Sequence, residues 1–179
     1  MLHLVLETAV PIDCISQKSL FLGESKPGSE AKSSLTRFYE GDILFGAMRP
    51  YFHKVCIAPF DGTTRTTVFV FSPILETDYA FSVLLLHDGS TIDYATSHST
   101  GSTIPYAVWS GSLDEMPVCI PAEPLRYAFN ELLEPLLSQI PKRYFESLTL
   151  TQTRDLLLPK LMSGEIRLRD AEKLVEDVA

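Results

Sequence analysis

The chain has 179 residues, of which 45% are hydrophobic, and a formal net charge of −8. This length favours one domain with an appendage, and the apolar content excludes a disordered chain. The longest apolar runs are too short to cross a bilayer, and the N-terminus has neither a basic region nor a small-residue cleavage site. Its three widely spaced cysteines fit a reducing cytoplasm, where we expect them to be buried, and argue against a disulfide framework or a zinc site.

The sequence pattern of residues 1–121 predicts a β-rich domain. Runs rich in β-branched and aromatic residues predict short strands, and clusters of Gly, Pro, Asp and Ser between them predict turns. The predicted strands are residues 2–6, 43–45, 55–58, 67–71 and 117–120, and the predicted turns are residues 23–28, 40–42, 61–64 and 72–73. Residues 79–87 have apolar side chains at more than alternating positions and predict a helix, with Asp78 as its N-cap.

The stretch from Asp93 to Leu113 is rich in Ser and Thr, with Gly101 near its middle. Such a composition does not form a packed element, so it predicts a loop. Hydroxyl groups donate and accept hydrogen bonds, which suits a phosphate backbone or base edges. The same hydroxyls are equally suited to capping helices and turns, so the pattern leaves both roles open.

After Pro121 the pattern becomes helical. Pro135 and Pro141 predict kinks or helix starts, and Pro159 with Gly164 predicts the end of the last helix. The leucines between residues 148 and 161 spread around the helix axis, whereas a helix on the surface of one domain buries a single stripe. This segment therefore predicts a second packing surface, provided by another chain. A short charged tail covers residues 165–179.

Positive charge is segregated in the first 121 residues. All their Lys and Arg residues lie between Lys18 and Arg65, and residues 66–125 contain none. A local excess of positive charge is what an anion-binding patch requires. Ordinary solvated surface charge is equally consistent with a window in which seven cations stand beside five acids.

Four segments resemble the specificity (S) subunits of type I restriction-modification systems. They are GDILFGAMRPYFHKVCIAPFDGTTRTTVFVFSP, YATSHSTGSTIPYAVW, FNELLEPLLSQI and ESLTLTQTRDLLLPKLMSGEI, in the order in which that family has them. The resemblance implies an α+β protein: a β-rich target recognition domain over residues 1–121, a coiled-coil-like helical segment over residues 122–164, and the tail. It covers most of the chain and corresponds to a half-length S subunit.

The resemblance also implies a function. On this resemblance the chain is expected to be a non-catalytic, cytoplasmic subunit. It would read one half of a bipartite DNA target within a restriction endonuclease and adenine-N6 DNA methyltransferase complex. Its implied partners are double-stranded DNA, methyltransferase (M) subunits and, through the complex, the restriction (R) subunit. Half-length forms are expected to pair as homodimers along antiparallel helices and to read an interrupted palindrome. The alternative is a scaffold that binds methyltransferase partners without reading DNA.

The candidate site residues follow from the matched motifs. Those expected to contact DNA are Arg49, Tyr51, His53, Lys54, Arg65, His98, Ser99, Thr100, Ser102, Thr103 and Tyr106. Those expected at the dimer or partner interface are Phe145, Leu148, Leu157 and Leu161. The family often has Arg where this chain has Tyr106, which removes a bidentate contact to guanine. We expect no catalytic residue, metal or cofactor, because adjacent Ser and His residues such as Ser97 and His98 do not form a relay and no metal-ligand spacing occurs.

Overall fold

The computed structural model describes residues 8–28 and 34–166. It divides into two compact units, Met1–Lys142 and Arg143–Ala179, which are treated separately below. The strand predicted over residues 2–6 and nearly all of the charged tail lie outside the described residues. The α+β fold class predicted from the sequence is confirmed, since short β-sheets are followed by a long helical segment.

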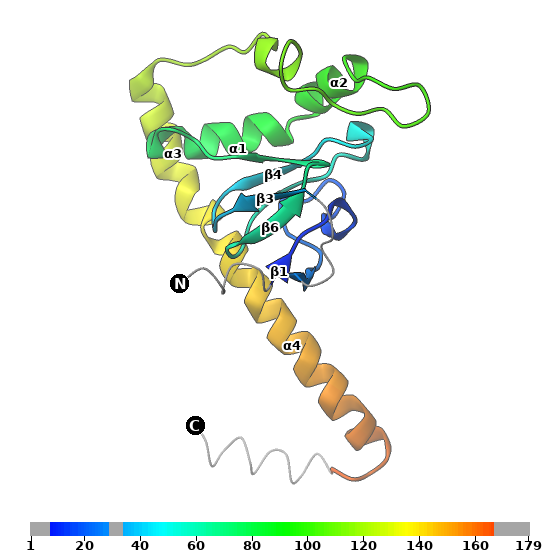
Figure 1. The fold of residues 1–179 in the computed structure, drawn as a ribbon. Coiled ribbons are helices and arrows are strands. Elements are labelled where there is room, and N and C mark those ends of the chain that lie inside the picture. The colour runs from blue at the N-terminus through cyan, green and yellow to red at the C-terminus, as the bar shows by residue number, and fades with distance from the viewer. Residues whose placement is uncertain (1–7, 29–33, 167–179) are drawn as a thin grey trace. The chain divides into compact units, whose positions relative to one another are not determined.

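The first unit contains two small sheets (Figure 1). One has the strand order β2-β1-β6-β3, and the other has the order β5-β4-β7. Their strands are β1 (Thr8–Ala9), β2 (Lys26–Pro27), β3 (Leu35–Phe38), β4 (Ile43–Gly46), β5 (Val55–Ile57), β6 (Gly62–Arg65) and β7 (Val68–Phe71). Single-turn 3-10 helices follow three of them: η2 (Ile12–Cys14), η4 (Pro50–Phe52) and η5 (Glu76–Asp78). A fourth, η6 (Leu113–Glu115), comes later in the chain.

Strand β4 is the centre of the hydrophobic core. Ile43 and Phe45 pack on one face with residues from helices α1 (Tyr79–His87) and α2 (Gly89–Ser97). Leu44 on the opposite face is also fully buried. A strand that is buried on both faces has a continuous run of apolar residues, so apolar and polar residues do not alternate along β4. The predictions for residues 43–45, 55–58 and 67–71 are therefore confirmed to within a residue or two. Burial raises the pKa of the Cys56 thiol, on the neighbouring strand β5, to about 12.

Three of the strand and turn predictions in the β-rich region are wrong. Residues 23–28, predicted as a turn, include strand β2. Residues 61–64, predicted as a turn, belong largely to β6, which pairs with β3 along its whole length. A side chain at Gly62 would meet the Phe38 ring at 2.7 Å, so close approach of two strands explains this glycine better than a turn does. Residues 117–120, predicted as a strand, form no regular element. Cys119 is exposed in that segment, whereas Cys14 and Cys56 are buried as expected.

Helix α1 (Tyr79–His87) confirms the predicted helix, but its N-terminal cap is not the predicted one. Asp78 makes no capping hydrogen bond and instead forms an ion pair with Arg126. The Ala80 amide donates to the Oδ1 atom of Asn130, at 3.0 Å, from the adjacent helix α3. The cap thus comes from tertiary packing of α1 against α3 (Figure 1).

Helix α2 (Gly89–Ser97) overturns part of the predicted Ser/Thr-rich loop, because residues 93–97 are helical. Asp88 separates α1 from α2 and caps α2, accepting a hydrogen bond from the Ser90 amide at 2.8 Å. Hydrogen bonds donated by Ser90 to the Asp88 carboxylate lower the pKa of Asp88. Thr91, Ile92 and Ala95 bury the inner face of α2.

Helices α3 (Glu123–Leu137) and α4 (Gln139–Met162) form the C-terminal helical segment. They are separated at Ser138, and Pro141 lies in the first turn of α4, as expected for a helix start. Pro159 lies within the last turn, and α4 ends at Met162, just before Gly164 adopts a φ of 75°. No helix among residues 8–28 and 34–166 is long and apolar enough to cross a membrane.

The second unit is the part of α4 that begins at Arg143, with the residues that follow it. Most of its large apolar side chains are exposed, with values from 36% at Leu161 to 80% at Met162, while Tyr144 and Ile166 are half-buried. The exposed side chains include all four residues predicted at the partner interface, together with further leucines: Phe145, Leu148, Leu150, Leu156, Leu157, Leu158, Leu161 and Met162. The predicted spread of leucines around the helix axis is thus matched by their exposure.

Candidate nucleic-acid interface

The turn that follows β4 carries the first group of predicted contact residues. Arg49 and His53 flank η4 in left-handed conformations, with φ values of 53° and 51°, and Pro50 begins the 3-10 turn. The His53 amide donates to the Pro50 carbonyl oxygen at 2.8 Å and closes the turn. Left-handed non-glycine residues are uncommon and persist only where surrounding structure holds them. We refer to residues 49–53 as the Arg49 turn.

Backbone hydrogen bonds hold the Arg49 turn beside residues 100–106, which we name the Thr100 loop. The Arg49 amide donates to the Pro105 carbonyl oxygen at 2.7 Å, and Met48 forms an isolated β-bridge with Tyr106. Thr100 and Tyr106 close the loop through reciprocal amide-to-carbonyl bonds of 2.9 and 2.8 Å. Two segments about fifty residues apart in sequence therefore form one surface.

Gly101 is required at the tight end of the Thr100 loop. Its φ is 92°, and a side chain there would lie 2.7 Å from the Ile104 carbonyl oxygen. The loop presents Ser102, Thr103 and Ile104 to solvent. On the adjoining turn Tyr51 is 47% exposed, with its ring 4.8 Å from that of Phe52. Exposed hydroxyls and an exposed aromatic ring, carried on a braced backbone, are suited to polar and stacking contacts with a ligand.

Tyr106 differs from its neighbours because its hydroxyl is engaged within the chain. The hydroxyl donates to the Thr66 carbonyl oxygen, between β6 and β7, and burial raises its pKa. The Tyr106 backbone also bridges Met48 and Thr100. Its observed contacts connect three segments of the first unit.

His53 joins the Arg49 turn to the end of α1. Its Nε2 atom lies 2.8 Å from the His87 carbonyl oxygen, to which it donates, and the two imidazole rings are 4.6 Å apart. The Nε2 atom of His87 is buried and has no hydrogen-bond partner in the described part of the chain. Burial, followed by the neighbouring His53, lowers the pKa of His87.

His98 and Ser99 lie where α2 ends, and their observed hydrogen bonds run back into that helix. The His98 Nδ1 atom is 3.0 Å from the Tyr94 carbonyl oxygen, and its ring stacks on Tyr94 with centroids 4.0 Å apart. The Ser99 hydroxyl donates to the Thr96 carbonyl oxygen at 2.6 Å. Both residues satisfy terminal carbonyl groups of α2, which is the capping role that the sequence left open.

The neighbouring Ser97 and His98 side chains also touch. The Ser97 hydroxyl lies 3.1 Å from His98 Nδ1 and 3.0 Å from the Tyr94 carbonyl oxygen. A carbonyl oxygen only accepts hydrogen bonds, so this arrangement favours a proton on Nδ1 pointing at Tyr94. An Nδ1 atom that carries a proton cannot act as a base toward Ser97. The contact is thus explained by helix capping.

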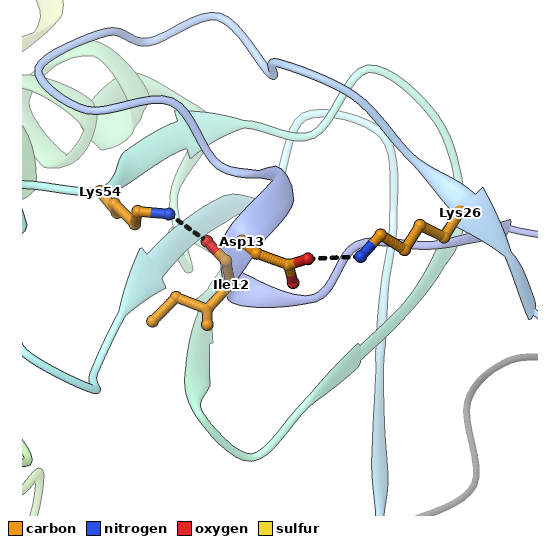
Figure 2. Close-up of polar contacts among 4 residues, drawn as sticks. All are labelled: Ile12, Asp13, Lys26 and Lys54. Atoms are coloured by element: carbon orange, nitrogen blue, oxygen red, sulfur yellow. Dashed lines mark hydrogen bonds and ion pairs between the residues drawn. The ribbon is translucent and has the colours of Figure 1, made fainter.

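Lys54 and Arg65 lie apart from the Thr100 loop contacts. Lys54 donates from Nζ to the Ile12 carbonyl oxygen at 2.7 Å, tying β5 to the η2 turn (Figure 2). Arg65 ends β6 and lines a hollow of about 280 Å³ with Asp13 and Lys26. The predicted contact residues therefore divide between the joined Arg49 turn and Thr100 loop, the end of α2, and the neighbourhood of η2.

Asp13 and Lys26 form an ion pair beside that hollow (Figure 2). The pair lowers the pKa of Asp13 and raises that of Lys26, mainly through the hydrogen bond between them. Lys26, Asp13 and the exposed Arg37 on β3 were not among the predicted residues. The sequence signal that could have indicated Lys26 and Arg37 was the segregation of positive charge, because both residues lie in the window from 18 to 65.

Arg49 itself is half-buried in the turn. Its Nε atom is enclosed and makes no hydrogen bond to the described residues. Within residues 8–28 and 34–166, no group of three or more His, Cys, Asp or Glu side chains is arranged to hold a metal ion.

Comparison with known proteins gives two relatives of defined family. The chain is 31% identical over 119 residues to the type I restriction enzyme MjaIX specificity subunit of Methanocaldococcus jannaschii, covering 65% of this chain and 27% of that protein. It is 28% identical over 141 residues to the type I restriction enzyme EcoDI specificity subunit of Escherichia coli, covering 75% and 30%. The chain therefore spans less than a third of the length of either relative. No family model matches it.

A solved structure shares the fold. A chain from a study of complex assembly and conformational transition of the type I R-M system superimposes with a TM-score of 0.57 at 19% sequence identity. The match covers 90% of this chain and 43% of that one. The likeness extends over both the β-rich unit and the helical segment.

Proposed function

Because this chain is a homologue of the specificity subunits of type I restriction enzymes, we propose that it reads one half of a bipartite DNA target and docks methyltransferase subunits. In this proposal the first unit contacts DNA and the helical segment binds protein. The chain has no catalytic role of its own. Double-stranded DNA, M subunits and, through the complex, the R subunit are its partners.

The observation that carries the DNA-reading proposal is the joining of the Arg49 turn to the Thr100 loop. The bond from the Arg49 amide to the Pro105 carbonyl oxygen joins a turn that carries an exposed aromatic ring to a loop that carries exposed hydroxyl groups. Hydroxyls can read base edges or bind phosphates, and an aromatic ring adds apolar or stacking contacts. A rigid backbone lowers the entropy lost when such a surface binds a ligand.

Different residues on this surface have different proposed roles. Ser102, Thr103 and Tyr51 are the candidates for reading bases, since their side chains are exposed. Arg49, His53, Ser99, His98 and Tyr106 are candidates for contacts that position the DNA, because each is also engaged with the backbone of the chain. Thr100 closes the loop that carries the readers.

The test is selection of duplexes from a randomised DNA pool with the full 179-residue chain, followed by binding of the enriched sequence over a range of salt concentrations. We expect one short motif to be enriched, or two copies in a gapped palindrome if the chain pairs. Ser102→Ala combined with Thr103→Ala should relax preference at one or two positions, costing about 1–3 kcal/mol per lost base contact. Ser110→Ala, an exposed serine outside the loop, is the matched control and should leave the motif unchanged.

A second candidate function is a scaffold that binds methyltransferase subunits without reading DNA. The observation that favours it is the exposed apolar surface of α4, which is independent of any DNA contact. The two functions differ in the selection experiment. Enrichment of no sequence, together with absence of salt-dependent binding, would leave the scaffold and remove the DNA-reading proposal.

A further inference from the structure

A row of basic side chains lies on one face of the pair β3/β6. Leu35 is directly opposite Arg65, and Arg37 is opposite Thr63. Directly opposed residues share a face, and so do residues two apart on one strand, so Leu35, Arg37 and Arg65 lie on the same face. Arg37 and Arg65 are diagonal neighbours, a relation that separates such residues by about 7–8 Å.

The positions of both arginines are defined. Arg37 lies over the Tyr39 ring, with its guanidinium carbon 5.6 Å from the ring centroid, and its Nη1 atom is 3.5 Å from the Tyr39 hydroxyl. Arg65 lines the hollow of about 280 Å³ that also includes Leu35, Asp13 and Lys26. We name the surface formed by Lys26, Arg37 and Arg65 the basic face.

Among the described residues that line this hollow, Asp13 is the one carboxylate. It extends from the η2 turn and pairs with Lys26, while Lys54 reaches the same turn from the other side and binds the Ile12 carbonyl oxygen (Figure 2). Lys54 thereby holds the turn that presents Asp13. The Asp13 carboxylate, which pairs with Lys26, competes with any incoming anion for that cation.

We propose that the basic face binds backbone phosphates of DNA. Asp13 stays paired with Lys26 until a phosphate displaces the carboxylate. The inference rests on the proposed function and adds to it a surface that positions the duplex without reading its bases. Three cations along a sheet face, of which one is held by a carboxylate, complement the evenly spaced charges of a nucleic-acid backbone. The role of Asp13 is to weaken binding to DNA of any sequence, so that the reading contacts decide the affinity.

The proposal predicts changes of opposite sign for variants that line the same hollow. Arg65→Ala should weaken binding to every duplex by roughly tenfold and reduce the slope of log K against log salt by about 0.9. Asp13→Asn keeps the shape of the side chain and removes its charge, so it should tighten binding to every duplex by about three- to tenfold and steepen the slope. Lys142→Gln removes an exposed positive charge from α4, at the end of the first unit, and is the matched control.

The measurements are fluorescence-anisotropy titrations of the full chain with the selected duplex and with a scrambled one, at several salt concentrations. Inorganic phosphate at the same ionic strength is included as a competitor and should displace DNA no better than chloride. Thermal unfolding of each variant checks that the fold is intact.

The outcomes separate this inference from the proposed function. If the wild-type chain selects a DNA motif but Arg65→Ala behaves as Lys142→Gln does, or Asp13→Asn weakens binding, the basic face is not a phosphate surface and DNA reading stands. Loss of preference at one base position in Arg65→Ala would assign Arg65 to base reading and also overturn the inference. Displacement of DNA by micromolar inorganic phosphate would identify a free-anion site instead. Absence of any DNA binding by the wild-type chain would remove both proposals.

Discussion

The two units of this chain differ in the solvent exposure of their apolar side chains. In the first unit Ile43, Phe45, Val55 and Val83 are fully buried. In the second unit the large apolar side chains of α4 are exposed, apart from the half-buried Tyr144. The first unit therefore has a core of its own, whereas the second has an apolar surface of a kind that soluble monomers rarely present. The first unit therefore folds around a core of its own, and the second unit leaves most of its described apolar side chains exposed.

Their ion pairs differ in the same way. The Asp78–Arg126 pair, which supports the packing of α3 near α1, is largely buried, with side-chain exposures of 23% and 17%. The Arg143–Glu146 pair on α4 has exposures of 62% and 57%. Solvent screens exposed pairs, so only the first is expected to matter for stability. Four predictions test this contrast, in order of decreasing effect.

The largest effect is expected from Phe45→Ala. The Phe45 ring packs 6.4 Å from Phe69 and 6.3 Å from Phe71, so its removal leaves a cavity and should lower the free energy of unfolding by about 3–5 kcal/mol. Leu158→Ala, on the exposed helix, should change it by at most about 0.5 kcal/mol at a concentration where the chain is monomeric. Urea unfolding followed by the fluorescence of Trp109 measures the first unit, since this is the only tryptophan. Equal losses in the two variants would contradict the contrast.

The second prediction concerns self-association through α4. We expect the wild-type chain to form a dimer with Phe145, Leu148, Leu157 and Leu161 at its interface. Leu157→Glu should weaken the dimer more than about a hundredfold, because each of the two chains loses a buried leucine that contributes about 1.5–3 kcal/mol. Its DNA affinity should fall as well, since two linked readers bind more tightly than one.

Sedimentation velocity at micromolar concentration measures this association. Thr151→Glu introduces the same charge at an exposed polar position of the same helix and should leave the dimer intact. A wild-type chain that sediments as a single 20.0 kDa species would rule out the homodimer and leave the methyltransferase subunit as the candidate partner for this surface.

The third prediction compares the two ion pairs. Arg126→Ala leaves Asp78 partly buried without its cation, and it also removes the bond from Arg126 Nε to the Pro121 carbonyl oxygen. We expect a loss of about 1–3 kcal/mol in the free energy of unfolding. Arg143→Ala, the matched change at the exposed pair, should cost less than about 1 kcal/mol. Chemical denaturation of both variants at equal concentration distinguishes them, and a larger effect at Arg143 would reverse the interpretation.

The smallest effect is a pH dependence from His87. Its pKa is lowered by burial and by His53, so the unfolded chain binds a proton at His87 more readily than the folded chain does. Stability from this residue is therefore present above the unfolded value of about 6.5 and is lost as the pH falls below it toward the folded pKa. Unfolding should be easier at pH 5.5 than at pH 7.5, and His87→Gln should reduce that difference. An unchanged difference in the variant would show that other groups cause it.

Some parts of the candidate site were predictable from local sequence. The apolar run from Ile43 to Phe45 predicted a buried strand, and this is confirmed by β4. Gly101 indicated a tight loop because only glycine tolerates that backbone conformation without strain. The contact partners of the basic side chains were not predictable from the sequence. Lys54 reaches the Ile12 carbonyl oxygen, and Arg65 lies beside Asp13, because of contacts between residues far apart in sequence.

What the sequence determined by itself is therefore the set of elements whose signals are local. The apolar run of β4, the helix α1, and the boundary of α3 and α4 beside Pro141 follow from patterns within a few residues, and so does the likeness to specificity subunits. Only the tertiary structure decided that residues 62–65 pair with β3, that Asn130 caps α1 from fifty residues away, and that the Arg49 turn meets the Thr100 loop. The physical reason is that strand pairing, caps supplied by other elements and the partners of long cations depend on which surfaces pack together, and that packing is a property of the whole core.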